Sequence, residues 1–326
     1  MSANESIAVI MPAYRAAATI NYALASVAAQ TLTPTEVVVY DDCSTDDTLE
    51  IARVWEDRLP IRIAQGDRNL GAGPARRAAI DASTSDLIAL LDADDYWFPD
   101  HLETMVATWR TTHDGLASAD PLRWISGRAL GALPLSAGSS VPPPGEQLAW
   151  MLRGNQLSTS TMFSRQRYEH VGGFRAQFRV GEDWDLWIRM VRAGAVVARA
   201  GHPTLLYRLH EQSTLSRDEG VSDIIGVLDA TAADGPFASD AERRGHRTGL
   251  RRAHAHKNLA DAYAAAAEGR TMTARVAGLK ATRGVRSVAL RGLAMAVAPR
   301  AIARRREAVR YETDTWMKRQ GPGGPA

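Results

Sequence analysis

The stretch Asp86-Leu-Ile-Ala-Leu-Leu-Asp92-Ala-Asp94-Asp95 decides the fold of this chain. Its apolar run, residues 88–91, is typical of a strand buried on both faces of a parallel sheet. Three carboxylates follow within four residues, and charges of one sign at this spacing call for a positive counterpart. A divalent cation such as Mg²⁺ or Mn²⁺ would supply it and would also bind phosphate oxygens. A plain acidic turn, with Asp95 or Asp100 capping the next helix, is the alternative, and the stretch alone leaves both open.

Strand-like and helix-like segments alternate around this stretch. Apolar runs predict strands at residues 7–12, 36–40, 61–63 and 88–91. Helices are predicted from Thr19, from the Ser44–Asp47 capping-box spacing through about residue 55, from Gly71, and from Pro99. Four such alternations in succession predict a right-handed, doubly wound α/β sheet.

Polar residues follow several of these strands. In a doubly wound sheet ligands bind beyond the carboxyl ends of the strands, so these residues should converge on one crevice. They are Tyr14, Asp41, Asp42, Asn69, Asp92 and Asp94. This expectation favours the metal site over the plain turn. Gly71-Ala-Gly73 is only a fragment of a dinucleotide-binding fingerprint, and no P-loop is present.

The alternation loosens after residue 109. Strands are predicted at 124–129, 158–163 and 204–209, the last ending at His210, and residues 134–145 read as a surface loop or a mobile active-site lid. Gly181 precedes an amphipathic helix that begins with Glu182 and Asp183. Acidic residues stabilise a helix N-terminus by about 0.3–1 kcal/mol, so the spacing alone favours a capping role over base catalysis.

The composition is that of an ordinary soluble globular protein. The chain has 326 residues, 45% of them hydrophobic and 23% charged. Its one cysteine, Cys43, excludes an internal disulfide and fits a reducing compartment. We expect no signal peptide, because strand-like sequence begins at Ile7. No apolar run is long enough to predict a transmembrane helix.

The charge is unevenly distributed along the chain. Residues 241–326 hold 19 Lys and Arg against 6 Asp and Glu, whereas residues 1–240 hold 20 against 31. The basic part predicts helices at 261–268, ended by Gly269, and at 285–310, interrupted by Pro299, with 321–326 disordered. It is either a helical cap with a solvated arginine face or an interfacial element at an anionic membrane. Nucleic acid is not expected as a partner, because no recognition motif accompanies the arginines.

Five motifs in order carry a resemblance to a known family. They are Val9-Ile-Met-Pro-Ala-Tyr14, Tyr40-Asp-Asp-Cys-Ser-Thr-Asp46, Asn69-Leu-Gly71, Leu91-Asp-Ala-Asp-Asp95, and Gly172-Gly-Phe174 followed by Gly181-Glu-Asp183. Together they resemble family 2 glycosyltransferases, which are inverting nucleotide-sugar enzymes of GT-A fold. The resemblance covers about residues 5–215. It implies a mostly parallel central sheet flanked by helices, followed by the helical extension.

The resemblance also implies roles for individual residues. In the donor pocket, Pro12 and Tyr14 would line the nucleotide, and Asp42 would accept a hydrogen bond from the base, which is typically uracil. Asn69 would contribute to the same pocket, and Arg76 would lie near the diphosphate. The implied metal is Mn²⁺ or Mg²⁺, and Asp94 resembles the residue of the DXD motif that binds it. Asp92 would approach the ribose or the metal. His210 would bind the metal or the diphosphate. Asp183 resembles the catalytic base, with Glu182 beside it.

The implied enzyme transfers one sugar from a nucleotide-sugar donor, UDP-linked, to a glycan or lipid-linked acceptor in cell-surface polysaccharide synthesis. The processive members' Gln-x-x-Arg-Trp motif is missing, which favours single addition. The catalytic domain would span residues 1–220, with a nucleotide half at about 1–110 and an acceptor half at about 111–220, and residues 221–326 would form the basic helical extension. A cytoplasmic location is implied, with peripheral contact at the inner face of the membrane as an option. A sugar nucleotidyltransferase and a non-catalytic nucleotide-sugar-binding protein remain the alternatives.

Overall fold

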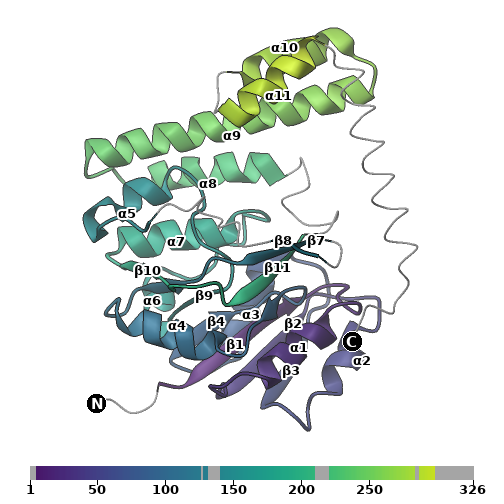
Figure 1. The fold of residues 1–326 in the computed structure, drawn as a ribbon, viewed down its shortest axis with the longest axis vertical. Helices are drawn as coiled ribbons and strands as arrows, with labels where there is room; N and C mark the ends of the chain where they lie inside the picture. Colours follow the sequence, from purple (N-terminus) through teal and green to yellow (C-terminus); the bar gives the residue numbers. More distant parts are fainter. Residues whose placement is uncertain (1–4, 126–127, 131–139, 210–219, 283–285, 298–326) are drawn as a thin grey trace. The chain divides into compact units, whose positions relative to one another are not determined.

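The computed structural model describes residues 5–125, 128–130, 140–209, 220–282 and 286–297 (Figure 1). The chain divides into two compact units, residues 1–210 and 211–326, which are described separately below. The first unit contains both sheets, and the described part of the second is helical. The sequence places the end of the catalytic domain slightly later, at about residue 220.

The large sheet of the first unit has the strand order β10-β6-β9-β4-β1-β2-β3. Its strands are β1 (Ile7–Ala13), β2 (Glu36–Asp41), β3 (Ile61–Gln65), β4 (Leu87–Leu90), β6 (Leu116–Ser118), β9 (Thr161–Ser164) and β10 (Val197–Arg199). Strands β3, β2, β1 and β4 are mutually parallel, which confirms the doubly wound prediction for this half of the sheet. Strand β9 runs antiparallel to β4 and β6, so the sheet is mostly rather than wholly parallel.

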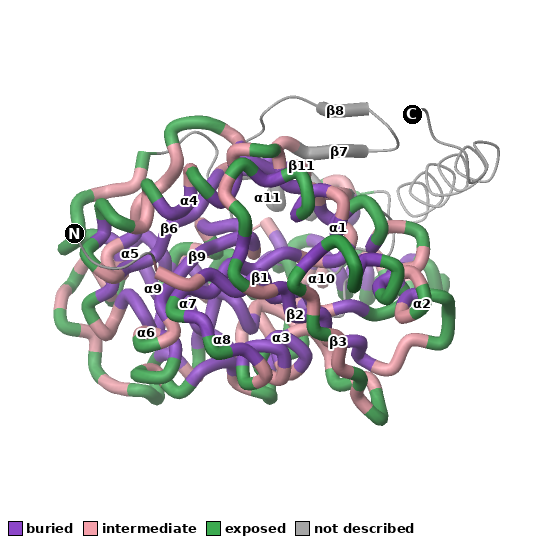
Figure 2. The backbone as a smooth tube through the Cα atoms, turned by 90° about the horizontal axis from the view of Figure 1, so that it is seen from below, coloured by how far each residue is buried: buried purple, intermediate pink, exposed green. Residues whose placement is uncertain are grey.

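Seven helices accompany the sheets in the described part of the first unit. They are α1 (Ile20–Ala28), α2 (Thr48–Arg53), α3 (Ala72–Asp81), α4 (His101–Arg110), α5 (Pro144–Met151), α6 (Arg165–His170) and α7 (Glu182–Arg192). Strand β4 is buried along its whole length and β1 along nearly all of it, and the central strands run through the interior of the unit (Figure 2). Pairing of β1 with β2 and β4 places the carboxyl ends of these three strands at one edge of the sheet, and α3 packs on β1 and β2.

The capping-box prediction for the second helix is wrong. Helix α2 begins only at Thr48, and its N-cap residue makes no side-chain capping bond. The Ser44 hydroxyl instead accepts the Arg15 N–H (2.8 Å), and Asp46 accepts hydrogen bonds from Thr48. Asp46 also accepts the Ala17 N–H through Oδ2, so Ser44 and Asp46 both bind the loop that follows β1 in addition to the local bonds from Thr48.

A second, four-stranded sheet has the order β5-β11-β7-β8. It consists of β5 (Tyr96–Trp97), β7 (Leu122–Ile125), β8 (Arg128–Leu130) and β11 (Leu205–Leu209). Strand β5 directly follows the acidic turn and pairs antiparallel with β11. Trp97 is fully buried and stacks on His101, with ring centroids 4.1 Å apart. This sheet therefore anchors the far side of the acidic turn.

Two predictions for the middle of the chain need correction. Residues 124–129, expected as one strand, belong to the antiparallel pair β7 and β8, with residues 126–127 between them outside the described ranges. The expected loop 134–145 ends earlier, because α5 begins at Pro144. Proline is tolerated in the first turn of a helix, since a backbone N–H at this position would make no hydrogen bond within the helix. Residues 131–139 lie outside the described ranges.

The described part of the second unit consists of α8 (Val221–Ala233), α9 (Asp240–Ala267), α10 (Thr271–Ala281) and α11 (Arg286–Val297). The Ser239 hydroxyl caps α9 by accepting the Glu242 N–H. The predicted helix 261–268 is the last part of α9, and Gly269, with φ +76°, ends it. Ala-rich faces of α9 and α10, together with Met295 of α11, form the core of these three helices. The predicted helix 285–310 is confirmed up to Val297; Pro299 and the tail 321–326 lie outside the described ranges.

Candidate active site

The acidic turn lies at the carboxyl end of β4, as the sequence predicts. Asp95 is 3% exposed, and its carboxylate accepts the Arg208 N–H of β11 at 3.0 Å. Burial raises the pKa of Asp95 well above its usual range, and the charges of Asp94 and Asp92 raise it further. The turn therefore places three carboxylates just beyond the end of β4, and that of Asp95 is buried.

Arg76 of α3 joins the acidic turn to the beginning of α7. It is 3% exposed; its Nη2 lies 2.6 Å from Asp92 Oδ1 and its Nη1 lies 2.5 Å from Glu182 Oε1. Burial opposes its charge, but the two carboxylates raise the pKa of Arg76 above its ordinary value, so the guanidinium stays protonated. Its Nε is buried with no hydrogen-bond partner among the described residues.

The approach of α3 to α7 depends on a glycine. A Cβ atom on Gly73 would lie 3.0 Å from Glu182 Cγ and 3.2 Å from its Cβ, so a side chain at this position would push the two helices apart. Gly181, at the N-cap of α7, has φ +79°, which glycine adopts without steric penalty. These two glycines let the chain bring Glu182 against Arg76.

Glu182 and Asp183 occupy the first turn of α7, where the sequence favours a capping role. Glu182 pairs with Arg76, and Asp183 Oδ1 accepts the N–H of the adjacent Trp184 at 2.6 Å. Burial raises the pKa of Glu182 to about 7, and the charge of Asp183 adds to this while Arg76 opposes it. Burial likewise raises the pKa of Asp183. Buried carboxylates with elevated pKa values are typical of general bases.

Asn155 orients the carboxylate of Asp183. Its Nδ2 donates to Asp183 Oδ2 at 3.1 Å, and the Thr159 hydroxyl lies 3.5 Å from the same oxygen. Asp183 as a whole is 9% exposed. The sequence analysis missed Asn155, because it lies in an irregular segment 28 residues before its partner.

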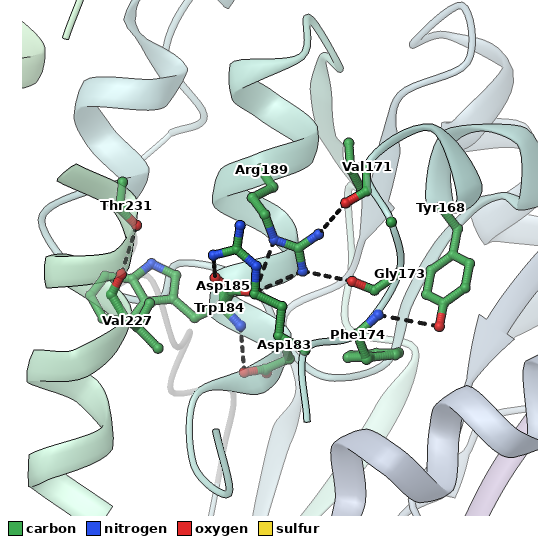
Figure 3. A network of polar contacts seen from close by, with 12 residues as sticks. Tyr168, Val171, Gly173, Phe174, Asp183, Trp184, Asp185, Arg189, Val227 and Thr231 are labelled. Carbon is green, nitrogen blue, oxygen red and sulfur yellow. Dashed lines mark hydrogen bonds and ion pairs between the residues drawn. The ribbon is translucent and has the colours of Figure 1, made fainter. Parts of the chain in front are cut away.

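A polar network behind α7 fixes the helix to the turn at residues 171–174 (Figure 3). Arg189 holds Asp185 through Nε (2.9 Å) and Nη2 (2.7 Å) and also donates to the carbonyl oxygens of Val171 and Gly173 at 2.7 Å. Gly173 has φ +70°, and a Cβ there would lie 2.7 Å from the Tyr168 ring. The Gly-Gly-Phe motif thus supports the helix that carries Asp183 instead of supplying reacting groups.

The residues predicted for the nucleotide occupy the ends of β1 and β2 and the loop before α3. Pro12 is in β1, and Tyr14 just after it is 44% exposed. Asp42 is 2% exposed, and its carboxylate accepts the N–H groups of Leu70 (2.9 Å) and Gly71 (2.7 Å). Its Oδ2 also accepts from Leu70 (3.0 Å), which leaves about one of the four acceptor positions of the carboxylate open.

Asn69 and Tyr207 complete the surroundings of the site. Asn69 Oδ1 accepts a hydrogen bond from Arg179 Nη2 at 3.2 Å. Tyr207, on β11, was not singled out from the sequence; burial and the charges of Asp95 and Asp92 raise its pKa above the ordinary value. Its phenol therefore remains protonated and can act as a hydrogen-bond donor near the acidic turn.

The donor set fits a divalent cation in charge, although its geometry is incomplete. Asp92, Asp94 and Asp95 supply hard oxygen ligands. Burial is the main cause of the raised pKa of Asp95, and the charges of Asp94 and Asp92, which a cation would offset, add to it. In the described residues, no three His, Cys, Asp or Glu side chains are arranged around one common position. His210 lies outside the described ranges, so its predicted metal role stays a prediction.

The sequence model of glycosyl transferase family 2 matches residues 8–173, which include β1 from its second residue, the acidic turn and the Gly-Gly pair. The chain belongs to this family. Membership confirms the resemblance and makes the protein a glycosyltransferase, which decides against the sugar nucleotidyltransferase and the non-catalytic binding protein left open by the sequence.

Individual family 2 proteins are similar over most of the chain. The succinoglycan biosynthesis protein ExoU of Rhizobium meliloti is 29% identical over 258 residues, which cover 74% of this chain and 73% of the relative. The putative glycosyltransferase EpsE of Bacillus subtilis is 30% identical over 207 residues, which cover 60% and 69%.

Solved structures confirm the GT-A fold. Residues 1–349 of S. aureus TarS, in complex with UDP, superpose with a TM-score of 0.61 at 15% identity and cover 91% of each chain. The mannosyltransferase PcManGT of Pyrobaculum calidifontis, in complex with GDP-Man and Mn²⁺, superposes with a TM-score of 0.59 at 19% identity, covering 98% of this chain and 85% of that one.

Proposed function

We propose that this family 2 glycosyltransferase catalyses metal-dependent, inverting transfer of a sugar from a UDP-linked donor to a glycan or lipid-linked acceptor in polysaccharide synthesis. One observation carries the proposal. A buried carboxylate of raised pKa, Asp183, is oriented by Asn155 and is connected through Glu182 and Arg76 to the acidic turn. The similarity to a succinoglycan biosynthesis protein and to a structure with bound UDP supports the product class and the donor.

In this reaction Asp183 is the general base. Its carboxylate takes the proton of the acceptor hydroxyl while that oxygen attacks the anomeric carbon, and the nucleoside diphosphate leaves from the opposite face. Attack opposite to the leaving group inverts the configuration at that carbon. Asn155 keeps Oδ2 in one orientation, and burial raises the pKa of Asp183, which makes its carboxylate a stronger proton acceptor.

Donor binding is assigned to the strand ends. We infer that Pro12 and Tyr14 line the nucleotide, that Asp42 uses its remaining acceptor position for the base, and that Asn69 borders the same pocket. Arg76 would lie near the diphosphate, and its buried Nε has no hydrogen-bond partner among the described residues. Asp94 and Asp92, with His210, would hold Mn²⁺ or Mg²⁺, which when bound neutralises charge on the leaving diphosphate.

Location forms the last part of the proposal. An enzyme that extends a lipid-linked glycan meets its acceptor at a membrane, and we infer a cytoplasmic protein in peripheral contact with the inner face. The basic charge of residues 241–326 supports contact with anionic lipid. Among the described residues, no helix combines the length and the apolar character needed to cross a bilayer.

The test is sugar release from UDP-glucose, UDP-N-acetylglucosamine and UDP-galactose, measured with Mn²⁺ and again with EDTA. We expect metal-dependent release of UDP by the wild-type protein and a loss of about 100-fold or more in Asp183→Asn. Asp81→Asn, which changes an exposed carboxylate of α3, is the matched control. Near wild-type turnover by a folded Asp183→Asn protein would contradict the role of this residue. No metal-dependent UDP release from any of the three donors by the folded wild-type protein would contradict the UDP-linked donor.

A further inference from the structure

Helix α10 carries its large apolar side chains on the outside. Met272, Val276 and Leu279 are 74%, 50% and 60% exposed. Their spacing of i, i+4 and i+7 places them on one face of the helix. The opposite face packs inward through small residues, among them Ala274 and Ala281, both fully buried. This arrangement reverses the usual one, in which the large apolar residues of an amphipathic helix face the core.

Helix α11 repeats the pattern. Leu290, Leu293 and Val297, at i, i+3 and i+7, are 71%, 52% and 67% exposed, whereas Met295 on the other side is fully buried. The two helices pack against each other and against α9 (Figure 1). We call the six exposed residues of α10 and α11 the outer apolar face. Scattered exposed apolar residues are normal, but six that are ordered by helical period on two adjacent helices indicate an interaction surface.

The charge around this face identifies the kind of partner. Residues 269–306 contain ten Lys and Arg and no Asp or Glu. On α10, Arg275 and Lys280 are exposed between and beside the apolar residues. A second copy of the chain would bring an equally basic segment against this one, which is unfavourable. A surface that combines large apolar side chains with an uninterrupted positive charge is complementary to an anionic lipid bilayer.

We propose that the outer apolar face of α10 and α11 inserts into the interfacial layer of an anionic membrane. The apolar side chains enter the boundary between headgroups and acyl chains, while the basic residues pair with anionic headgroups. The small buried residues keep the hairpin folded without these large side chains, so they remain available to lipid. The inference rests on the peripheral membrane contact proposed above and names the surface that makes it.

Vesicle flotation of the full-length protein tests the proposal. The vesicles are phosphatidylcholine alone and phosphatidylcholine mixed with phosphatidylglycerol. The test variant combines Met272→Gln, Leu279→Gln and Leu290→Gln, since glutamine is a good helix former at exposed positions. The matched control is Val54→Gln with Tyr22→Gln, which removes apolar side chains that are 62% and 53% exposed in the first unit.

We expect the wild-type and control proteins to float with anionic vesicles, to be released by salt, and not to float with phosphatidylcholine alone. The test variant should bind about tenfold or more weakly while its helix content by circular dichroism is unchanged. Equal flotation of wild type and test variant would overturn the assignment of this surface and leave membrane contact standing. No flotation of the wild type would overturn both.

Two further readings separate the remaining cases. A wild-type dimer in sedimentation equilibrium that the test variant dissociates would show that a second copy covers the face, which overturns the lipid proposal. Metal-dependent release of UDP from the donor is measured on the same samples, so a failure of the glycosyltransferase proposal is recognised independently of the vesicle result.

Discussion

Replacing Glu182 with glutamine should make the stability of the first unit less dependent on pH. Glu182 shares the Arg76 guanidinium with Asp92 and lies next to Asp183 in sequence, so three carboxylates surround one buried cation. Glutamine keeps the size of the side chain and an acceptor oxygen for Arg76, but it carries no charge and does not titrate. The substitution therefore isolates the contribution of one buried charge.

The expected magnitude follows from the pKa of Glu182, which burial raises from 4.5 to about 7. A group whose pKa is higher in the folded state contributes its full stabilisation below pH 4.5, and this contribution is lost as the pH rises through 7. The difference between the two pKa values corresponds to about 3 kcal/mol. Relative to the wild type, Glu182→Gln should thus gain about 3 kcal/mol of unfolding free energy between pH 4.5 and a pH above 7.

Urea unfolding, followed by tryptophan fluorescence, measures this quantity. Seven of the eight tryptophans lie in residues 1–210, so the signal reports on the first unit. The unfolding free energies of wild type and variant are compared between about pH 5 and pH 8. Glu169→Gln, at a carboxylate that is 64% exposed on α6, is the matched control and should follow the wild type at every pH. Parallel curves for Glu182→Gln and wild type, or a variant that weakens relative to wild type as the pH rises, would refute the reasoning.

Three further predictions concern the site. Asn155→Ala removes a hydrogen bond that lowers the pKa of Asp183, so the acid limb of the pH profile of kcat/KM should move to higher pH. The value of kcat near neutral pH should fall about tenfold. An unchanged pH profile would contradict the orienting role of Asn155. Gly73→Ala places a Cβ atom 3.0 Å from Glu182 Cγ. The substitution should lower the unfolding free energy by about 1–3 kcal/mol in the same urea assay. A stability equal to that of the wild type would mean that α3 and α7 can move apart at little cost. Asp94→Asn should weaken Mn²⁺ binding about tenfold or more by isothermal titration with UDP present, with Asp81→Asn as its control, and unchanged affinity removes this residue from the metal site.

The parts of the fold that follow from local pattern were predictable. The apolar run before Asp92 predicted β4, and the alternation around it predicted that β1, β2, β3 and β4 run parallel. Side chains at the ends of these strands could be named in advance because strand ends of a parallel sheet lie at one edge. The order of five short motifs then identified the family, since order and spacing together are far more specific than any one motif.

Contacts between distant segments were not predictable in the same way. Nothing in the spacing of the chain indicates that Arg76 meets Glu182 106 residues later, or that Gly73 is required for the approach. The second sheet was missed for a related reason: β5 has two residues and pairs with β11 from the far end of the unit. Even Ser44, which had the right spacing for a cap, bonds to Arg15 instead, because a tertiary partner was available.

The buried Arg76 cluster is best explained by function and not by stability. Ion pairs removed from water gain little net free energy, and apolar residues of similar volume can often replace them without loss. Here the arrangement is less favourable still, since Asp92, Glu182 and Asp183 surround one guanidinium and burial raises the pKa values of the latter two. Such an excess of negative charge is useful where a cation has to be bound and a hydroxyl proton has to be accepted. Under the mechanism proposed above, the same electrostatic imbalance that weakens the fold at this point would serve both to bind the cation and to accept the proton.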